Sequence, residues 1–102
     1  MNASPVSLGQ IVQSKAGRDK RRFFLVVGFA EESHVWIADG DLRKINRPKR
    51  KKMKHLACKP VVDQDIMKRL DHHKPVYDVE IRNVLNRYQA NIRGAQACRN
   101  KM

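Results

Sequence analysis

The longest apolar run of the chain, Phe23–Ala30 (FFLVVGFA), constrains the fold more than any other segment. It is rich in β-branched and aromatic residues and is short, so it predicts a buried strand rather than a helix. A strand over Leu8–Ser14 precedes it, and the charged segment Lys15–Arg22, with its glycine, predicts the loop between the two. After a turn at residues 31–33, His34–Ala38 predicts the next strand.

Two further strands are expected before the chain becomes helical. Asp39-Gly40 is a dipeptide whose positive φ angles suit a tight hairpin turn. Leu42–Ile45 is expected to pair as a fourth strand before Pro48, and a fifth short strand is expected around Lys54–Ala57. Five short, twisted strands close or nearly close into a small barrel. The expected fold is therefore α+β, with an SH3-like barrel.

Beyond Pro60 the apolar periodicity becomes helical. Asp63–Asp71 predicts a short helix with acidic residues near its start, and Asp78 is expected to cap a longer helix that ends at Gly94. Its apolar face consists of Ile81, Val84, Leu85, Tyr88 and Ile92. We expect this face to pack on the barrel or on the first helix, because an isolated helix of about fifteen residues is marginal in water.

The length of the chain leaves room for one domain, since 102 residues is the size of a single small domain. The expected organisation is a barrel with a basic loop over residues 1–60, a helical extension packed on it over 61–94, and a tail over 95–102.

Positive charge is the strongest functional signal. Lys and Arg outnumber Asp and Glu by 22 to 10, a formal net charge of +12, which favours polyanionic partners. The segment Arg43–Lys54 (RKINRPKRKKMK) holds eight cations in twelve residues and no acid. Such a density repels itself unless an anion is near, so we favour phosphate binding over a merely solvated loop or a localisation tract.

The candidate phosphate contacts form two clusters. We expect Lys49, Lys51 and Lys52 to be loop cations without a role in the core, and Arg47 and Arg50 to fork onto phosphate oxygens. The full set is Lys15, Arg18, Lys20, Arg21 and Arg22 around Gly17, and Arg43, Lys44, Arg47, Lys49, Arg50, Lys51, Lys52 and Lys54 in the second segment.

These residues resemble a known family. Gly9–Ala30 (GQIVQSKAGRDKRRFFLVVGFA) resembles a KOW motif, the strand, loop and strand unit of RNA-binding proteins that include several large-subunit ribosomal proteins. Val35–Leu56 (VWIADGDLRKINRPKRKKMKHL) is similar to the archaeal and eukaryotic large-subunit ribosomal protein fourteen-e and to small bacterial KOW proteins. The resemblance covers roughly half the chain. It implies an SH3-like barrel that binds structured RNA, above all ribosomal RNA, through the cations named above.

Other candidate sites have weaker support. Asp39 and Asp41 flank Gly40, but a hairpin turn explains this pair without catalysis. The metal-capable residues His55, Cys58, His72 and His73 lack the spacing of a zinc site. We therefore expect a protein that is not an enzyme and has no metal, cofactor or small-molecule substrate.

The aromatic side chains are a further candidate, since bases of single strands stack on aromatic rings. Trp36, Phe23, Phe24 and Phe29 lie inside apolar runs, so packing in the core is the expected role, with Phe23 as a candidate for exposure. We expect both Trp36 and Val26 to be buried.

The expected compartment is the cytoplasm. No apolar run approaches the roughly 18 residues of a membrane span, residues Met1–Leu8 lack the features of a signal peptide, and Cys58 and Cys98 are expected to remain thiols. The expected function is RNA binding by a monomer, at ribosomal RNA or the large ribosomal subunit. The alternatives are an adaptor whose barrel binds a transcription or translation factor and, more weakly, a nuclease or RNA-modifying enzyme.

Overall fold

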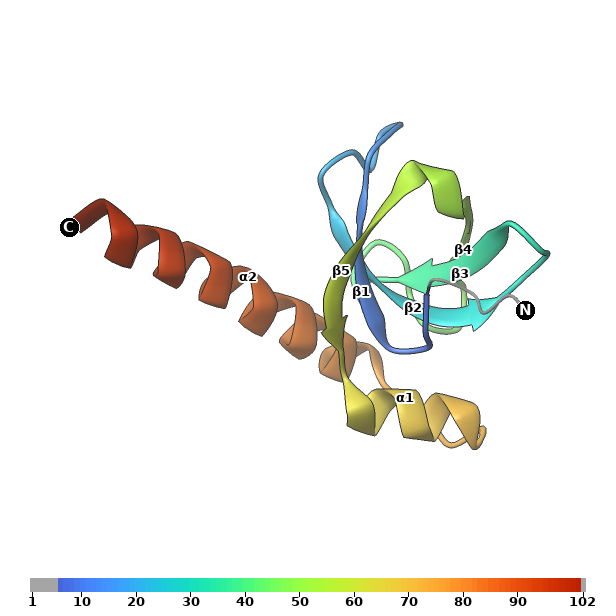
Figure 1. Cartoon of the computed structure of the whole chain (residues 1–102). Coiled ribbons are helices and arrows are strands. Elements are labelled where there is room, and N and C mark those ends of the chain that lie inside the picture. The colour runs from blue at the N-terminus through green and yellow to red at the C-terminus, as the bar shows by residue number, and fades with distance from the viewer. Residues whose placement is uncertain (1–5, 102) are drawn as a thin grey trace.

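A five-stranded antiparallel sheet followed by two helices makes up the computed structural model, which describes residues 6–101, with side chains over 6–92. The strand order is β4-β3-β2-β1-β5 (Figure 1). The elements are β1 (Gln10–Ser14), β2 (Phe23–Phe29), β3 (His34–Ala38), β4 (Lys49–Lys52), a 3-10 turn (Met53–His55), β5 (Leu56–Val62), α1 (Gln64–Asp71) and α2 (Asp78–Lys101). The expected α+β class is confirmed.

Apolar side chains cover both faces of the sheet. Register pairs Leu25 with Ala38 and Val26 with Ile37, so successive residues of β2 point to opposite faces. One face belongs to a core of Val6, Val12, Phe24, Val26, Val35, Ile37 and Leu56. The other face packs on the helices in a core that includes Ile11, Leu25, Ala38, Ile66, Ile81, Val84 and Leu85. Because β2 lies in the middle of the sheet between two cores, its sequence is continuously apolar.

The fourth strand does not lie where the sequence predicted it. Residues 42–45, expected to be a strand, belong to a connection over residues 39–48, and β4 begins only after Pro48. The carboxylate of Asp39 explains the difference. Its Oδ1 accepts hydrogen bonds from the backbone amides of Asp41 (2.9 Å) and Arg43 (2.8 Å), which turns the chain out of the sheet. The predicted tight hairpin turn at Asp39-Gly40 is thus the start of a longer connection.

β5 is longer than the predicted fifth strand and begins after the 3-10 turn. It pairs with β1 at the edge of the sheet, where Pro60 is tolerated because an edge strand has amides that need no partner in the ladder. The predicted boundary at residue 60 therefore falls inside a strand, and the sheet continues to Val62.

Both helices begin at or next to the predicted positions, and α1 also ends at the predicted Asp71, whereas α2 does not end where the sequence predicts. Asp63 caps α1 by accepting a hydrogen bond from the backbone amide of Ile66 (3.0 Å). α2 runs past Gly94 to Lys101, so the predicted helix end and the predicted tail at 95–102 are wrong for residues 95–101. One glycine costs about 1 kcal/mol relative to alanine in a helix, which is too little to end it. Met102 lies outside the described residues.

α2 packs on the sheet through its predicted apolar face. Ile81, Val84 and Leu85 are buried, and the ring of Tyr88 meets that of Phe23 edge-on, with centroids 5.4 Å apart and planes at 70°. The last turns of the helix extend away from the sheet (Figure 1).

No helix among the described residues combines the length and the apolar character that a membrane span requires.

The start of α2 also holds the connection between β3 and β4. Asp78 was expected to cap the helix, and its Oδ1 accepts a hydrogen bond from the backbone amide of Ile45 (2.7 Å). Arg82 Nη1 donates a hydrogen bond to the backbone oxygen of Gly40 (2.6 Å). A Cβ at Gly40 would come 2.3 Å from the backbone oxygen of Asp78. The connection therefore lies directly against the helix, and only glycine fits at its closest approach.

Gly40→Ala is expected to destabilise the protein by about 3 kcal/mol, because overpacking against Asp78 adds to the strain of a positive φ. Gly17→Ala is the matched control. Both glycines have positive φ, 76° and 79°, but the nearest atom to a Cβ at Gly17 is Lys51 Nζ, at 3.7 Å. We expect about 1 kcal/mol for the control, measured by urea unfolding. Equal losses for the two variants would contradict the close packing of the connection on α2.

Candidate nucleic-acid interface

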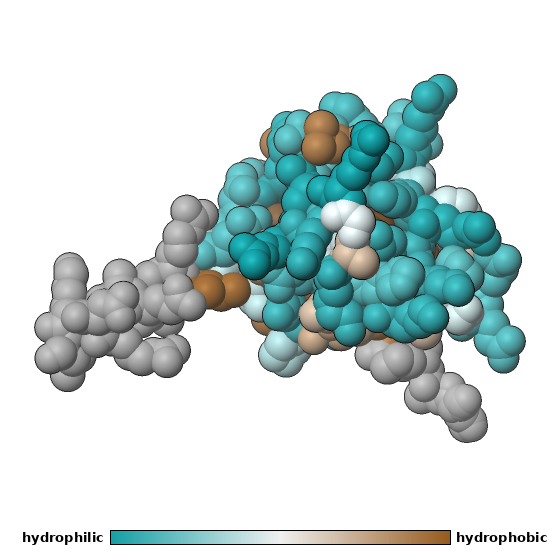
Figure 2. Space-filling view, turned by 90° about the horizontal axis from the view of Figure 1, so that it is seen from above, coloured by the Kyte–Doolittle hydropathy of each residue, from teal (hydrophilic) through white to brown (hydrophobic). Residues whose placement is uncertain are grey.

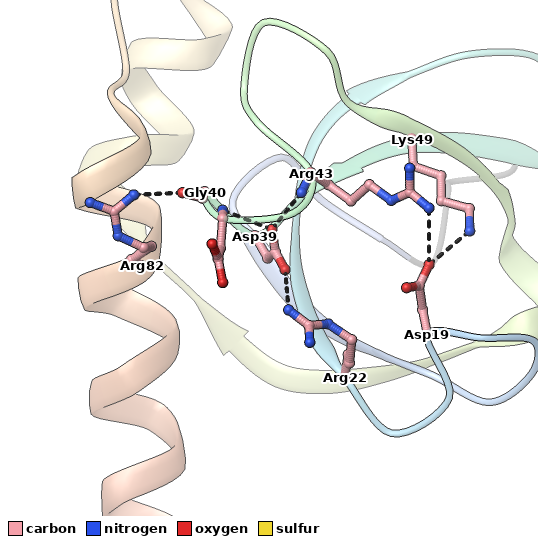
Figure 3. Close-up of polar contacts among 8 residues, drawn as sticks. Asp19, Arg22, Asp39, Gly40, Arg43, Lys49 and Arg82 are labelled. Carbon is pink, nitrogen blue, oxygen red and sulfur yellow. Dashed lines mark hydrogen bonds and ion pairs between the residues drawn. The ribbon is translucent and has the colours of Figure 1, made fainter.

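The two cationic segments that the sequence singles out meet in the structure, and the buried carboxylate of Asp19 joins them. Asp19 belongs to the β1–β2 loop, residues 15–22, and is 6 % exposed. Lys49 Nζ, from β4, lies 2.7 Å from its Oδ2, and Arg43 Nη2, from the connection, lies 3.7 Å from the same oxygen (Figure 3). One acid of the first segment thus binds two cations of the second.

Asp39, at the start of the β3–β4 connection just before the second segment, is bound by a cation of the first segment. It is 5 % exposed, and its Oδ2 accepts from Arg22 Nη2 at 2.8 Å, while its Oδ1 holds two backbone amides of the connection (Figure 3). The β1–β2 loop and the β3–β4 connection therefore each contain one buried aspartate: Arg43 and Lys49 bind Asp19, and Arg22 binds Asp39. This exchange fixes the loop against the connection.

Both carboxylates are held in their charged form. The hydrogen bond from Lys49 lowers the pKa of Asp19 below its ordinary value of 3.8, against the opposing effect of burial. Burial acts to raise the pKa of Asp39, but the hydrogen bond from Arg22 and those from two backbone amides outweigh it and lower this pKa as well. Asp39 in turn raises the pKa of Arg22. The ion pairs are therefore intact at neutral pH.

β4 divides its four cations between the two faces of the sheet. Lys49 lies opposite Ile37 and Lys51 opposite Val35, so both point to the face of the sheet that carries the core of Val12 and Phe24, and both reach the β1–β2 loop. Lys51 Nζ is 3.4 Å from the backbone oxygen of Ala16. The prediction that Lys49, Lys51 and Lys52 are loop cations is therefore wrong, because all three lie on strand β4. Lys49 and Lys51 in addition bind the neighbouring loop.

Arg50 and Lys52 point to the other face, opposite Trp36 and His34. Arg50 pairs with Glu31, whose side chain is exposed. Such a pair at the surface contributes little to stability and exchanges readily for another anion.

The remaining candidates are exposed cations without a carboxylate partner in the described part of the chain. They lie on the β1–β2 loop, on the β3–β4 connection, at the end of β4 and in the 3-10 turn. The backbone amide of Lys15 donates to the oxygen of His55 (2.9 Å), which brings the 3-10 turn next to the β1–β2 loop. Figure 2 views the molecule from above and shows a surface that is mostly hydrophilic, with several small apolar patches. These cations are Lys15, Arg18, Lys20, Arg21, Lys44, Arg47, Lys52 and Lys54.

The β1–β2 loop has a defined shape that projects its cations. The amide of Lys20 donates to the oxygen of Gly17 (3.2 Å), and the amide of Arg21 donates to that of Ser14 (2.8 Å). Arg21 has a φ of 75°, a conformation that costs an L residue about 1–2 kcal/mol. Strain of this kind concentrates at functional sites. An arginine at a position that glycine would occupy at lower cost points to a role for its side chain.

Sequence reasoning missed the residues that organise the site, namely Asp19, Asp39 and Arg82. A signal was present for Asp19, because it is the lone acid among the five cations of residues 15–22. Asp39 was interpreted only as part of a turn. Nothing in the local sequence indicates that Arg82 reaches Gly40, because the two are 42 positions apart.

The other sequence candidates also have defined places. Val26 and Phe24 are fully buried, Phe23 packs on Tyr88, and the exposed phenylalanine is Phe29, at 50 %. Trp36 is only partly buried, which corrects the prediction for it. Among the residues that the structure describes, no three His, Cys, Asp or Glu side chains come together as a set of metal ligands.

No protein-family model matches the sequence, and comparison with curated proteins gives no significant match. The functional argument therefore depends on the placement of these charges.

Replacing both Asp19 and Asp39 by Asn is expected to lower stability at neutral pH by about 1–3 kcal/mol, because charged hydrogen bonds are removed. Since the folded-state pKa values are depressed, their contribution is complete above the ordinary value of 3.8 and disappears as pH falls through the lower folded values. Urea unfolding should therefore show a gap between wild type and variant at pH 7 that shrinks at lower pH.

Glu32→Gln serves as the control, since it removes an exposed charge with no partner among the described residues. A gap that stays constant from pH 7 to strongly acidic solution would contradict the assignment of stabilising charge to Asp19 and Asp39.

Proposed function

We propose that the protein is a noncatalytic RNA-binding protein of the KOW type, with an SH3-like barrel that binds structured RNA, above all ribosomal RNA, and acts at the large ribosomal subunit in translation. One observation carries the proposal. Eight exposed cations that lack a carboxylate partner within residues 6–92 lie on the β1–β2 loop, the β3–β4 connection, the end of β4 and the 3-10 turn. They come from segments that buried ion pairs hold together.

The chemistry of this surface suits phosphate rather than a small acidic ligand. Its cations lie along several segments and do not converge on one point, so they match a ligand whose negative charge is also distributed. A nucleic-acid backbone has this property, and neutralising its phosphates releases condensed counterions. Structured RNA is recognised largely through its shape and its backbone, which requires little reading of bases.

Three features support the KOW and barrel assignments. β1, the basic loop and β2 follow in the order strand, loop, strand that the resemblance implies, with Gly9 directly before β1 and Gly17 in the loop. Both glycines have positive φ, 78° and 79°. A single 3-10 turn joins the two edge strands, β4 and β5, as the sheet of a small barrel requires if its edges are to approach each other.

The arginines and lysines of the surface are expected to act differently. Arg18, Arg21 and Arg47 present planar guanidinium groups that fork onto two phosphate oxygens, whereas Lys20 and Lys44 act as point charges that accept many geometries. Arg22, Arg43 and Lys49 have a different part, since their first partners are Asp19 and Asp39. They hold the surface in shape and add to its potential.

The variant Arg18→Gln, Lys20→Gln, Arg47→Gln is expected to weaken binding to a short RNA hairpin and to lower the slope of log affinity against log salt. The slope should fall by roughly 0.7–0.9 for each phosphate that the variant no longer neutralises, so by about 2–3 in total. Stability should stay within about 0.5 kcal/mol of the parent, because none of the three has a side-chain partner in the described structure. Fluorescence anisotropy at several salt concentrations measures the affinity and the slope, and urea unfolding measures the stability.

The matched control is Lys68→Gln, Lys74→Gln, Arg87→Gln, which removes the same charge from exposed helical and linking positions. It should leave the salt slope nearly unchanged. An equal fall in slope for both variants would mean that binding follows net charge alone and that the surface around the β1–β2 loop is not the site. No binding of the parent at low salt would contradict RNA binding itself.

A further inference from the structure

A shallow, open apolar cavity of about 420 Å³ lies on the face of the sheet that packs on the helices, beside the β3–β4 connection. Its walls are Val27 of β2, Trp36 of β3, Leu70 of α1, and Ile45 and Pro48 of the connection. The helices pack on this face of the sheet, and the indole of Trp36 remains partly exposed beside them. A partly exposed indole beside other apolar side chains has the character of a binding surface, because tryptophan is enriched at interfaces and contiguous apolar patches mark interaction sites.

The sheet is shaped to hold this indole. Gly28 pairs with Trp36 across β2 and β3, next to a register shift between Val26 and Gly28. A Cβ at Gly28 would come 3.3 Å from Trp36 Cδ1, closer than a comfortable contact. The missing side chain lets the ring rest against the backbone of β2, which restricts its rotation. A ring fixed in this way is a preorganised surface for a second flat group.

Cations lie around this cavity. Arg50 is the direct cross-strand neighbour of Trp36, and the two cavity residues of the connection, Ile45 and Pro48, follow the exposed Lys44 and Arg47 in the sequence. The cavity thus joins an apolar, aromatic interior to a positively charged edge. An unpaired nucleotide has the complementary form, a flat base with an apolar face linked to a phosphate.

We propose that this cavity receives an unpaired base of the bound RNA, which stacks on Trp36 while Lys44, Arg47 and Arg50 hold the flanking phosphates. The inference rests on the proposed function and extends it from backbone binding to a preference for RNA with a single-stranded position. Stacking on aromatic rings tolerates any base, so the preference concerns strandedness rather than sequence.

Trp36 is the single tryptophan of the chain, so its fluorescence reports on the cavity directly. Titrating the full chain with a single-stranded oligoadenylate of eight nucleotides should quench most of this emission, because a stacked base lies on the indole. An abasic oligonucleotide of the same length and charge is the control probe. It should bind through phosphates and leave the emission nearly unchanged.

Two variants separate stacking from packing. Trp36→Leu keeps an apolar side chain in the cavity and removes the aromatic face, and should lower affinity for oligoadenylate roughly 5- to 100-fold. The affinity of Trp36→Leu for a fully paired RNA duplex should stay within about twofold of that of the parent, because the duplex is bound through its phosphates and offers no unpaired base. Trp36→Phe should restore much of the missing affinity. Circular dichroism and urea unfolding check that both variants fold.

The outcomes distinguish this inference from the proposed function. If duplex and oligoadenylate both bind, but Trp36 emission does not change and Trp36→Leu binds as the parent does, base stacking is contradicted while RNA binding stands. If quenching by the abasic probe equals that by oligoadenylate, the base is not the occupant and the inference is likewise overturned. If no RNA binds at low salt, the proposed function fails, and the inference that depends on it fails too.

Discussion

The cationic end of the molecule depends on the ion pairs that the carboxylate of Asp19 forms with Lys49 and Arg43. A buried carboxylate is costly without a partner, so folding the β1–β2 loop against the sheet requires cations at this position. Lys49 and Arg43 provide them from two different parts of the second basic segment. The attraction opposes the mutual repulsion of the cations, and it brings into one surface residues that lie about thirty positions apart.

This arrangement explains why strongly basic segments have a defined conformation here. Asp39 bends the chain after β3, and Arg22 binds Asp39 from the loop (Figure 3). The start of α2 contacts the connection through Asp78 and Arg82. The C-terminal helix is therefore part of the structure that positions the cations. The exposed cations need not be fixed individually, because backbone and buried pairs place the segments that carry them.

Local patterns were sufficient for elements whose own residues determine them. The run of β2, the strand at His34–Ala38 and the cap of α1 at Asp63 follow from composition and periodicity, and the structure has them at or near the predicted bounds. The position of β4 could not be predicted in this way, because it depends on the hydrogen bonds of Asp39 and on the contact between Ile45 and Asp78. α2 continues through Gly94 although a glycine is a typical end signal.

The same distinction applies to the candidate site. The density of Lys and Arg in the sequence located both basic segments, but the same signal predicted phosphate binding for every cation in them. The strand alternation along β4 distinguishes these cations. Lys49 and Lys51 point to the face that carries the core of Val12 and Phe24, whereas Lys52 points to the other face and is exposed. Similarly, the apolar run around Trp36 predicted burial, whereas the indole lies at a cavity between the sheet and the connection. These are tertiary contacts, and no single segment encodes them.

The central claim is that the β1–β2 loop and the β3–β4 connection form one RNA-binding surface. Nuclear magnetic resonance of the 15N-labelled full chain, titrated with a short RNA hairpin, tests it most directly. Backbone amides of residues 18–21 and 44–47 should shift along the same titration curve and saturate together at one RNA per protein. Shifts confined to one of the two segments, saturation at different ratios, or the largest changes on α2 around Arg87 would contradict it.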